Sequence, residues 1–437
     1  MGQPAAGAAA AMQRSKSGRR MGLRSLVRAC WSPPMSDCEC YGDRQEVVVE
    51  YSAMLLPPPR IPSPSSSLQS LLMASLPDDL LVECLARVPR GSIRQCAMVC
   101  RHWRTIVQSD LYYRARGKLR MLESFVVVFG GIGSGLSSAT YSQSTGQWQA
   151  GLLFPDNHDH DHDTSSSDHT FIHAQSAVLQ HRILVLGATL AGDCTMVYDT
   201  WRRTVARAAP MLLPRKKFAC CVIGDRVYVA GGASRCRASR DIVMHEAEVY
   251  DPELDTWRRL PDMRHRRYGC IGAAVDGIFY VIGGIRRPYA YLSSMDCFDP
   301  RVNAWLKSRP LPIGGGCVIS CTVVGSCIYM LSSHAVELSF WRYDTRGQAW
   351  SRINLPPIPS PLRIDNLLKF SCVTVGSAVH IIQVGGCIDD LLRRGGRNPR
   401  GLREGLVLVY DTRGQEWSKA PHLPDMRNGA VCAVVQC

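Results

Sequence analysis

The sequence predicts a mainly β protein, in which a repeated β domain follows a small all-α module and a disordered tail. Three observations support this prediction. Short apolar runs and turns recur six times over residues 121–437, helical apolar stripes occupy residues 74–118, and residues 1–70 are rich in Ala, Ser, Pro and Arg. Because these stretches differ in composition and periodicity, we expect them to form separate units.

The composition is that of an ordinary globular protein. The chain has 437 residues, of which 46% are hydrophobic and 20% charged, so it is long enough to bury a full core. It contains no apolar run of about 18 residues, and its first apolar stretch precedes the basic residues instead of following them. We therefore expect no transmembrane helix and no secretory leader, and a location in the cytoplasm, the nucleus or both.

Residues 1–70 form the predicted tail and linker. Basic residues accumulate before the first acid, Asp37; they are Arg14, Lys16, Arg19, Arg20, Arg24 and Arg28. Such a segment is typical of a nuclear-import patch, of an organellar transit peptide or of a plain disordered basic tail. We favour the disordered tail and keep the transit peptide as an alternative.

The nineteen cysteines are scattered and form no C-x2-C pair, so neither a zinc ribbon nor a disulfide framework is indicated. We expect most of them to be reduced core residues. Residues 156–163 alternate Asp and His after one Asn, a composition that suits either a weak divalent-cation site or a flexible polar loop. We favour the loop and assign no metal site.

Two helical stripes follow the tail. Asp78 and Asp79 come after Pro77 and open a pattern of apolar residues that ends at Pro89. That pattern consists of Leu80, Leu81, Cys84, Leu85 and Val88, and a second runs from Ile93 to Val107. A few short helices in about forty residues bury little surface by themselves, so this module needs a partner.

The segment from Leu76 to Arg104 resembles the F-box, the module through which ubiquitin-ligase receptors bind an adaptor of the Skp type. The resemblance rests on the Leu-Pro start, the apolar stripe and the Val-Cys-Arg-His-Trp run. It implies an adaptor-binding surface made of Leu76, Pro77, Leu80, Leu81, Leu85, Val88, Pro89, Val99, Cys100 and Trp103. Cys84 departs from the larger aliphatic residue that the family often has. The alternative is a small helical cap on the following domain, in which the same residues form an internal hydrophobic core and bind no other chain.

The repeat in residues 121–437 is marked by an aromatic residue followed seven positions later by tryptophan. The copies are Tyr141/Trp148, Tyr250/Trp257, Phe298/Trp305, Tyr343/Trp350 and Tyr410/Trp417, and a sixth copy has Val205 seven residues after Tyr198. The stretches between the marks favour turns, for example Asp251-Pro252. Each pair therefore predicts two strands joined by a tight connection.

An apolar run that ends in two small residues precedes each aromatic mark. The small pairs are Gly130-Gly131, Gly187-Ala188, Gly231-Gly232, Gly283-Gly284, Ser332-Ser333 and Gly385-Gly386. The whole pattern resembles the kelch repeat, in which each copy forms one four-stranded blade, and it implies a six-bladed β-propeller. A β-solenoid or sandwich with accidental tryptophan spacing is the alternative.

The first copy lacks an opening strand, whereas residues 427–435 match the opening strand of the other copies and have no blade after them. We expect this C-terminal strand to complete the first blade, which closes the ring and removes two exposed sheet edges.

Basic residues concentrate in the connections after the second and fourth strands of the copies, which emerge on one face of a four-stranded antiparallel blade. After second strands these include Arg235, Arg237, Arg286, Arg287, Arg397 and Arg400; after fourth strands they include Arg215, Lys216, Lys217, Arg264, Arg266 and Arg267. Guanidinium groups suit carboxylate or phosphate recognition. With a formal net charge of +14, this face predicts an acidic or phosphorylated protein partner.

The sequence contains no nucleotide-binding or catalytic motif that we can identify, neither a P-loop nor G-x-S-x-G nor H-E-x-x-H, and it implies no cofactor. The two resemblances imply a substrate receptor of an SCF-type ubiquitin ligase that binds a Skp-type adaptor and, through it, a cullin. A kelch interaction scaffold outside any ligase is the alternative. Nucleic-acid binding ranks below both, because Tyr289 and Tyr291 are the only aromatic residues among the arginines.

Overall fold

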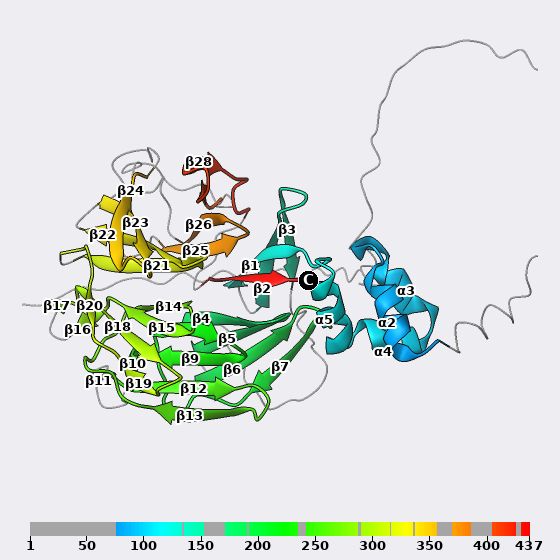
Figure 1. Ribbon diagram of the computed structural model, residues 1–437, viewed down its shortest axis with the longest axis horizontal. Coiled ribbons are helices and arrows are strands. Elements are labelled where there is room, and N and C mark those ends of the chain that lie inside the picture. Colours follow the sequence, from blue (N-terminus) through cyan, green and yellow to red (C-terminus); the bar gives the residue numbers. More distant parts are fainter. Residues whose placement is uncertain are drawn as a thin grey trace, which may run out of the picture. The chain divides into compact units, whose positions relative to one another are not determined.

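The computed structural model describes residues 76–132, 135–152, 171–189, 192–234, 242–286, 290–314, 316–334, 337–355, 369–385, 404–424 and 430–437. A group of short helices precedes a set of antiparallel sheets (Figure 1). The basic tail and the alternating His/Asp run lie outside the described residues.

The helical module consists of α2 (Asp78–Ala86), the 3-10 turn η1 (Arg90–Ser92), α3 (Ile93–Val99), α4 (Arg101–Val107) and α5 (Asp110–Lys118). The start of α5 is capped by Ser109, whose hydroxyl accepts a hydrogen bond from the backbone N–H of Tyr112. The core of the module contains Leu81, Leu85 and Val107.

The sheets form six blades, in which the strands follow one another in order. Their strands are β29 (Val431–Gln436), β1 (Ser124–Ile132), β2 (Gly135–Ser142) and β3 (Gln147–Leu152) in blade 1; β4 (Phe171–Leu179), β5 (Arg182–Thr189), β6 (Gly192–Asp199) and β7 (Thr204–Ala208) in blade 2; β8 (Ala219–Ile223), β9 (Arg226–Ala230), β12 (Ala247–Asp251) and β13 (Thr256–Leu260) in blade 3; β14 (Ile271–Val275), β15 (Ile278–Ile282), β18 (Ser294–Asp299) and β19 (Ala304–Trp305) in blade 4; β21 (Cys317–Val324), β22 (Cys327–His334), β23 (Glu337–Asp344) and β24 (Ala349–Ile353) in blade 5; β25 (Lys369–Val375), β26 (Ala378–Gly385), β27 (Val407–Asp411) and β28 (Glu416–Lys419) in blade 6.

Two short hairpins and one short strand are added to the blades. The hairpins β10 (Ala233–Ser234) with β11 (Ile242–Val243) and β16 (Ile285–Arg286) with β17 (Ala290–Tyr291) extend the connections after the second strands of blades 3 and 4. The short strand β20 (Arg309–Pro310) pairs with β18.

The C-terminal strand closes the ring. β29 pairs antiparallel with β1, from Ser124 opposite Gln436 to Phe129 opposite Val431. The first strands of neighbouring blades contact each other all the way round, from β4 through β8, β14, β21 and β25 to β29 and back to β4. The fold is therefore the six-bladed β-propeller that the repeats predicted, and its first blade is built from both ends of the repeat region.

Hairpin register explains the seven-residue mark. Tyr250 and Trp257 are directly opposite each other on β12 and β13, with ring centroids 5.1 Å apart. The indole N–H of Trp257 donates to the backbone carbonyl of Ala209, which follows the last strand of the preceding blade. Corresponding bonds run from Trp148 to Pro421, Trp305 to Pro261, Trp350 to Pro310 and Trp417 to Asn354. The repeated tryptophan thus ties each of these blades to the one before it.

The double glycine allows a sharp exit from the second strand. Gly231 and Gly232 both have positive φ values, 68° and 96°, which side chains disfavour. A Cβ on Gly231 would lie 2.7 Å from the backbone oxygen of Arg267, and one on Gly232 would lie 2.9 Å from that of Lys216. Glycine is therefore required where the connections after the second and fourth strands pack together.

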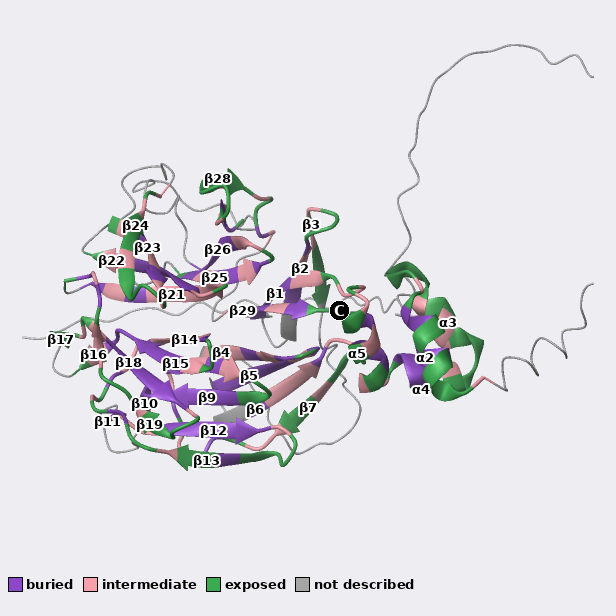
Figure 2. Cartoon of the chain, in the orientation of Figure 1, coloured by how far each residue is buried: buried purple, intermediate pink, exposed green. Residues whose placement is uncertain are grey.

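Hydrophobic clusters fill the junctions between blades. Tyr228 of blade 3 packs with Phe279 and Phe298 of blade 4 in one such cluster, and related clusters join the remaining neighbours. Buried residues accordingly follow the strands of the sheets (Figure 2). This packing makes the propeller a rigid scaffold on which loops carry function.

Candidate functional site

One side of the helical module presents apolar side chains to solvent. Leu80 is 50% exposed, Met98 77% and Val99 63%, and α2 and α3 carry long exposed stretches (Figure 2). In a module this small, such residues are available for contact with another chain.

A hydrogen bond and a carbonyl contact position this side. The imidazole Nε2 of His102 lies 2.9 Å from a carboxylate oxygen of Asp78, which joins the start of α4 to the start of α2. Arg104 donates to the backbone carbonyl of Ala97 at 3.1 Å and braces α4 against α3. The two segments that carry Leu80 and Val99 are therefore held together.

The predicted adaptor-binding residues divide into two groups. Pro77, Leu80, Pro89, Val99 and Cys100 are exposed, and Leu76, Val88 and Trp103 are half-buried. Leu81 and Leu85, by contrast, are only 2% and 3% exposed and lie in the module's own core. They face the helices α4 and α5 and leave little exposed side-chain area, so the structure places them in the core of the module, and their contact with an adaptor stays a prediction.

Met98 was missed by sequence reasoning although it is among the most exposed apolar residues of the module. Its position beside Val99 in the Met-Val-Cys run was the available signal. Leu111 on α5, which is 60% exposed, was missed as well.

The other side of the module is fixed to blades 1 and 2. The indole N–H of Trp201, in the turn between β6 and β7, donates to the backbone carbonyl of Val107. Its ring centroid lies 5.8 Å from those of both Tyr112 and Tyr113. Tyr113 also donates to the backbone oxygen of Gln436 at 3.2 Å, and burial raises the pKa of this tyrosine to about 12. Within the part of the chain that the structure describes, these contacts involve α5 and the end of α4, whereas Leu80, Met98 and Val99 stay exposed.

Charged groups line the same junction. The carboxylate of Asp110 at the start of α5 lies 3.3 Å from Arg182 and 3.7 Å from the buried His181. Asp199 lies 3.4 Å from His181. Burial by itself would raise the pKa of Asp199, but the neighbouring His181 imidazole and the hydrogen bond from the backbone N–H of Arg202 outweigh burial and lower it. The junction therefore combines aromatic packing with a charge network.

Only part of the predicted basic face lies within the described residues. Arg286 is exposed on the β16–β17 hairpin; Arg235, Arg237, Arg287, Arg397 and Arg400 lie outside the described residues. The connections after second and fourth strands do lie next to each other, since Lys216 forms an isolated β-bridge with Ala233 and Tyr268 forms one with Ile285.

Arg215 and Arg267 do not belong to that face, contrary to the sequence-based expectation. Both are fully buried: Arg215 forms an ion pair with Glu248, and Arg267 donates to Asp296 at 2.7 Å. Each also donates to the carbonyl of a strand-ending glycine, Gly231 or Gly283. These arginines hold the blade connections in place and cannot meet a partner.

Within the described residues, no group of three or more His, Cys, Asp or Glu side chains is arranged to hold a metal ion. The helices in the same part of the chain are all too short or too polar to span a membrane.

Comparisons with known proteins agree with this architecture. The model of the F-box domain matches residues 73–115, and that of the Kelch motif matches residues 214–264 and 266–312. The chain is 40% identical over 393 residues to the F-box/kelch-repeat protein At5g26960 of Arabidopsis thaliana, covering 86% of this chain and 92% of the relative.

More distant relatives share the same two modules by name. The F-box/kelch-repeat protein SKIP30 of Arabidopsis thaliana is 29% identical, with 64% of this chain and 76% of the relative covered. Among solved structures, that of YjhT matches with a TM-score of 0.47 at 15% identity, covering 58% of this chain and 84% of that chain.

Proposed function

The chain belongs to the F-box/kelch-repeat protein family, and from this premise we propose that it is the substrate-recognition subunit of an SCF-type ubiquitin ligase. In this role the helical module docks a Skp-type adaptor, and the propeller binds the protein to be ubiquitinated. The observation that carries the proposal is the exposure of Leu80, Met98 and Val99, since burying them against a partner recovers free energy.

The proposed role is non-catalytic. Transfer of ubiquitin is carried out by other subunits, and this chain raises the effective concentration of substrate lysines near them. A fixed attachment of the helical module to blades 1 and 2, through Trp201 and Tyr113, supports such a role because it limits the positions that a bound substrate can take.

The substrate surface that we propose is the face formed by the connections after second and fourth strands. Its exposed cations among the described residues of the predicted set are Lys217, Arg264, Arg266 and Arg286. The composition of the remaining loops, with Arg235, Arg237, Arg287, Arg397 and Arg400, favours an acidic or phosphorylated protein segment.

Co-purification with a Skp-type adaptor tests the adaptor proposal. The double variant Leu80→Ser with Val99→Ser should retain the adaptor at least about tenfold more weakly than the wild type, because each residue offers aliphatic area worth about 1 kcal/mol or more in a buried contact. Val302→Ser is the matched control: this valine of the blade 4 turn has the same 63% exposure as Val99 and lies outside the module.

The alternative function is a kelch interaction scaffold without a ligase. Failure of the folded wild-type chain to retain any Skp-type adaptor would favour that alternative over the ligase role. Equal loss of adaptor in the Val302→Ser control would likewise contradict the proposed surface.

A further inference from the structure

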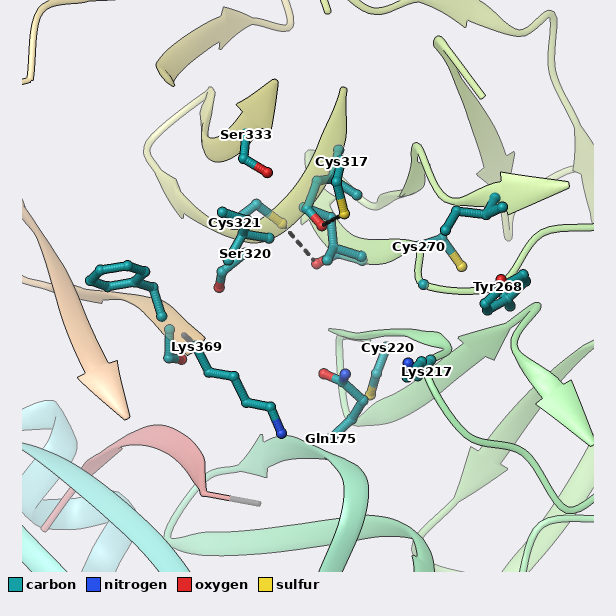
Figure 3. A pocket seen from close by; sticks show the side chains of 18 of the residues that line it. Gln175, Lys217, Cys220, Tyr268, Cys270, Cys317, Ser320, Cys321, Ser333 and Lys369 are labelled. Carbon is teal, nitrogen blue, oxygen red and sulfur yellow. Dashed lines mark hydrogen bonds between the residues drawn. The ribbon is translucent and has the colours of Figure 1, made fainter. Parts of the chain in front are cut away.

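The innermost strands of the propeller surround a cavity of about 560 Å³. Residues of all six blades line it, including Gln175, Cys220, Ile271, Ser320 and Phe370, with Ala430 beside β29. Figure 3 shows Gln175, Cys220 and Ser320 around one space. Small-molecule sites in proteins typically have volumes of about 300 to 1,000 Å³, so the cavity has the size of a ligand site.

Two lysines from different blades reach this space. Lys369 begins β25 and extends across the cavity toward Gln175, and Lys217 lies in the connection before β8 (Figure 3). Among the described residues neither lysine has a carboxylate within 4.0 Å, the limit for an ion pair, and none of the lining residues is acidic. Burial and the positive charge of Lys217 both lower the pKa of Lys369. The cavity therefore concentrates positive charge without an internal counterion among these residues.

The backbone at Lys217 gives an independent indication. Its φ of 53° is in the left-handed region, where a non-glycine side chain is strained. Arg215 and Arg267 make equivalent contacts in consecutive blades, so Lys217 occupies the place that Gly269, with φ of 66°, fills one blade later. A Cβ on Gly269 would meet no atom within 4 Å. The space around this position would thus accept glycine or lysine. Lysine at residue 217 adds a positive charge despite its strained backbone.

The rest of the lining suits the body of an organic molecule. Burial raises the pKa of the Cys220 thiol to about 12 and that of Cys321 further, so both are protonated and uncharged at neutral pH. Such thiols behave as small apolar groups. Ser320 and Gln175 add polar groups that can orient a ligand.

We propose that the central cavity binds a small organic anion, whose phosphate or carboxylate group lies between Lys217 and Lys369 and whose body packs against the innermost strands. This site is separate from the proposed adaptor surface. It adjoins the proposed substrate face, because Lys217 belongs to the connection after the fourth strand of blade 2. It adds a small-molecule ligand to a chain for which the sequence implied no cofactor.

Calorimetric titration of the full-length protein tests the proposal. Phenyl phosphate and citrate are the probes, and phenol is the uncharged counterpart of the first. We expect saturable binding of at least one anion, weakening at high salt, and no comparable binding of phenol. Lys217→Gly, which installs the residue of the neighbouring blade, and Lys369→Gln should each weaken binding about tenfold or more, as loss of a charge-assisted hydrogen bond does.

Lys419→Gln is the matched control, since Lys419 is an exposed lysine at the end of β28 and outside the cavity. Melting curves of all variants verify folding. Absence of binding by both anions, or equal weakening by Lys419→Gln, overturns the proposal. A phosphoserine peptide that binds through Lys217 and Lys369 while both small anions fail overturns it as well, because the charge would then belong to a protein ligand. Each result is independent of adaptor binding.

Discussion

Deletion of residues 426–437 should unfold the propeller. This deletion removes β29, in which Val431 and Val435 are 8% and 2% exposed. Burial of each valine contributes about 1.5 to 3 kcal/mol, so the two together contribute about 3 to 6 kcal/mol. The deletion also removes the backbone ladder to β1 and opens two sheet edges. Because whole domains are stable by only about 5 to 15 kcal/mol, we expect loss of the folded state.

Circular dichroism and size-exclusion chromatography of the shortened chain measure this effect. The milder variant Val435→Ala should remain folded and lose about 2 kcal/mol, from the two missing methyl groups and the cavity that they leave. Gln436→Ala is its control, because the next side chain along the strand is exposed. An unchanged melting temperature after the deletion would refute the reasoning that the C-terminal strand closes the ring.

Two further predictions concern buried charge. Arg215→Met should lower the free energy of unfolding, measured in denaturant, by about 3 to 5 kcal/mol, because it leaves the buried carboxylate of Glu248 without its cation. The control Arg87→Met breaks the exposed ion pair with Glu83 and should change stability by less than about 1 kcal/mol. Equal effects of the two substitutions would contradict this account. Burial lowers the pKa of His380 to about 4 from 6.5, so the unfolded chain binds the proton more tightly. The free energy of unfolding should therefore decrease as the pH is lowered from 6.5 to 4, by at most about 3 kcal/mol from this residue. His380→Leu should flatten the pH dependence of the melting temperature, and an unchanged pH dependence would contradict this role of His380.

The propeller could be predicted from the sequence because its clearest signal depends on residues that are close together in the chain. An aromatic residue and a tryptophan seven positions later are cross-strand neighbours in a tight hairpin, as Tyr343 and Trp350 are here. Local register is encoded by a few adjacent residues, so five intact copies were sufficient. The opening strand of blade 1 was also recognisable, since residues 427–435 resembled strands that were already identified.

The sequence did not show which apolar residues of the helical module face its core and which face solvent. Leu80 and Leu81 are adjacent in one apolar stripe, yet one is 50% and the other 2% exposed. Successive residues of an α-helix are about 100° apart, so a stripe two residues wide can face both a core and a partner. Which of the two faces inward depends on where α4 and α5 pack, and no local pattern contains that information.

The burial of arginines could not be read from the sequence either. Arg215 and Arg286 look alike as basic residues of blade connections, and only the position of Glu248 in three dimensions makes the first a structural ion pair. Trp201 was missed for a related reason. Blade 2 lacks the indole at the usual place, Val205, and its tryptophan four residues earlier contacts the helical module instead.

The strand that closes the ring also meets the helical module. The backbone oxygen of Gln436 accepts from Tyr113, and that of Cys437 accepts from Arg90. Thr200, one residue before Trp201, lies 3.1 Å from the thiol of Cys437. Closure of the propeller and attachment of the module therefore depend on the same few residues. A change that loosens β29 should consequently weaken the fixed position of the module even where the remaining blades stay folded, so closure of the ring and the position of the helical module are coupled.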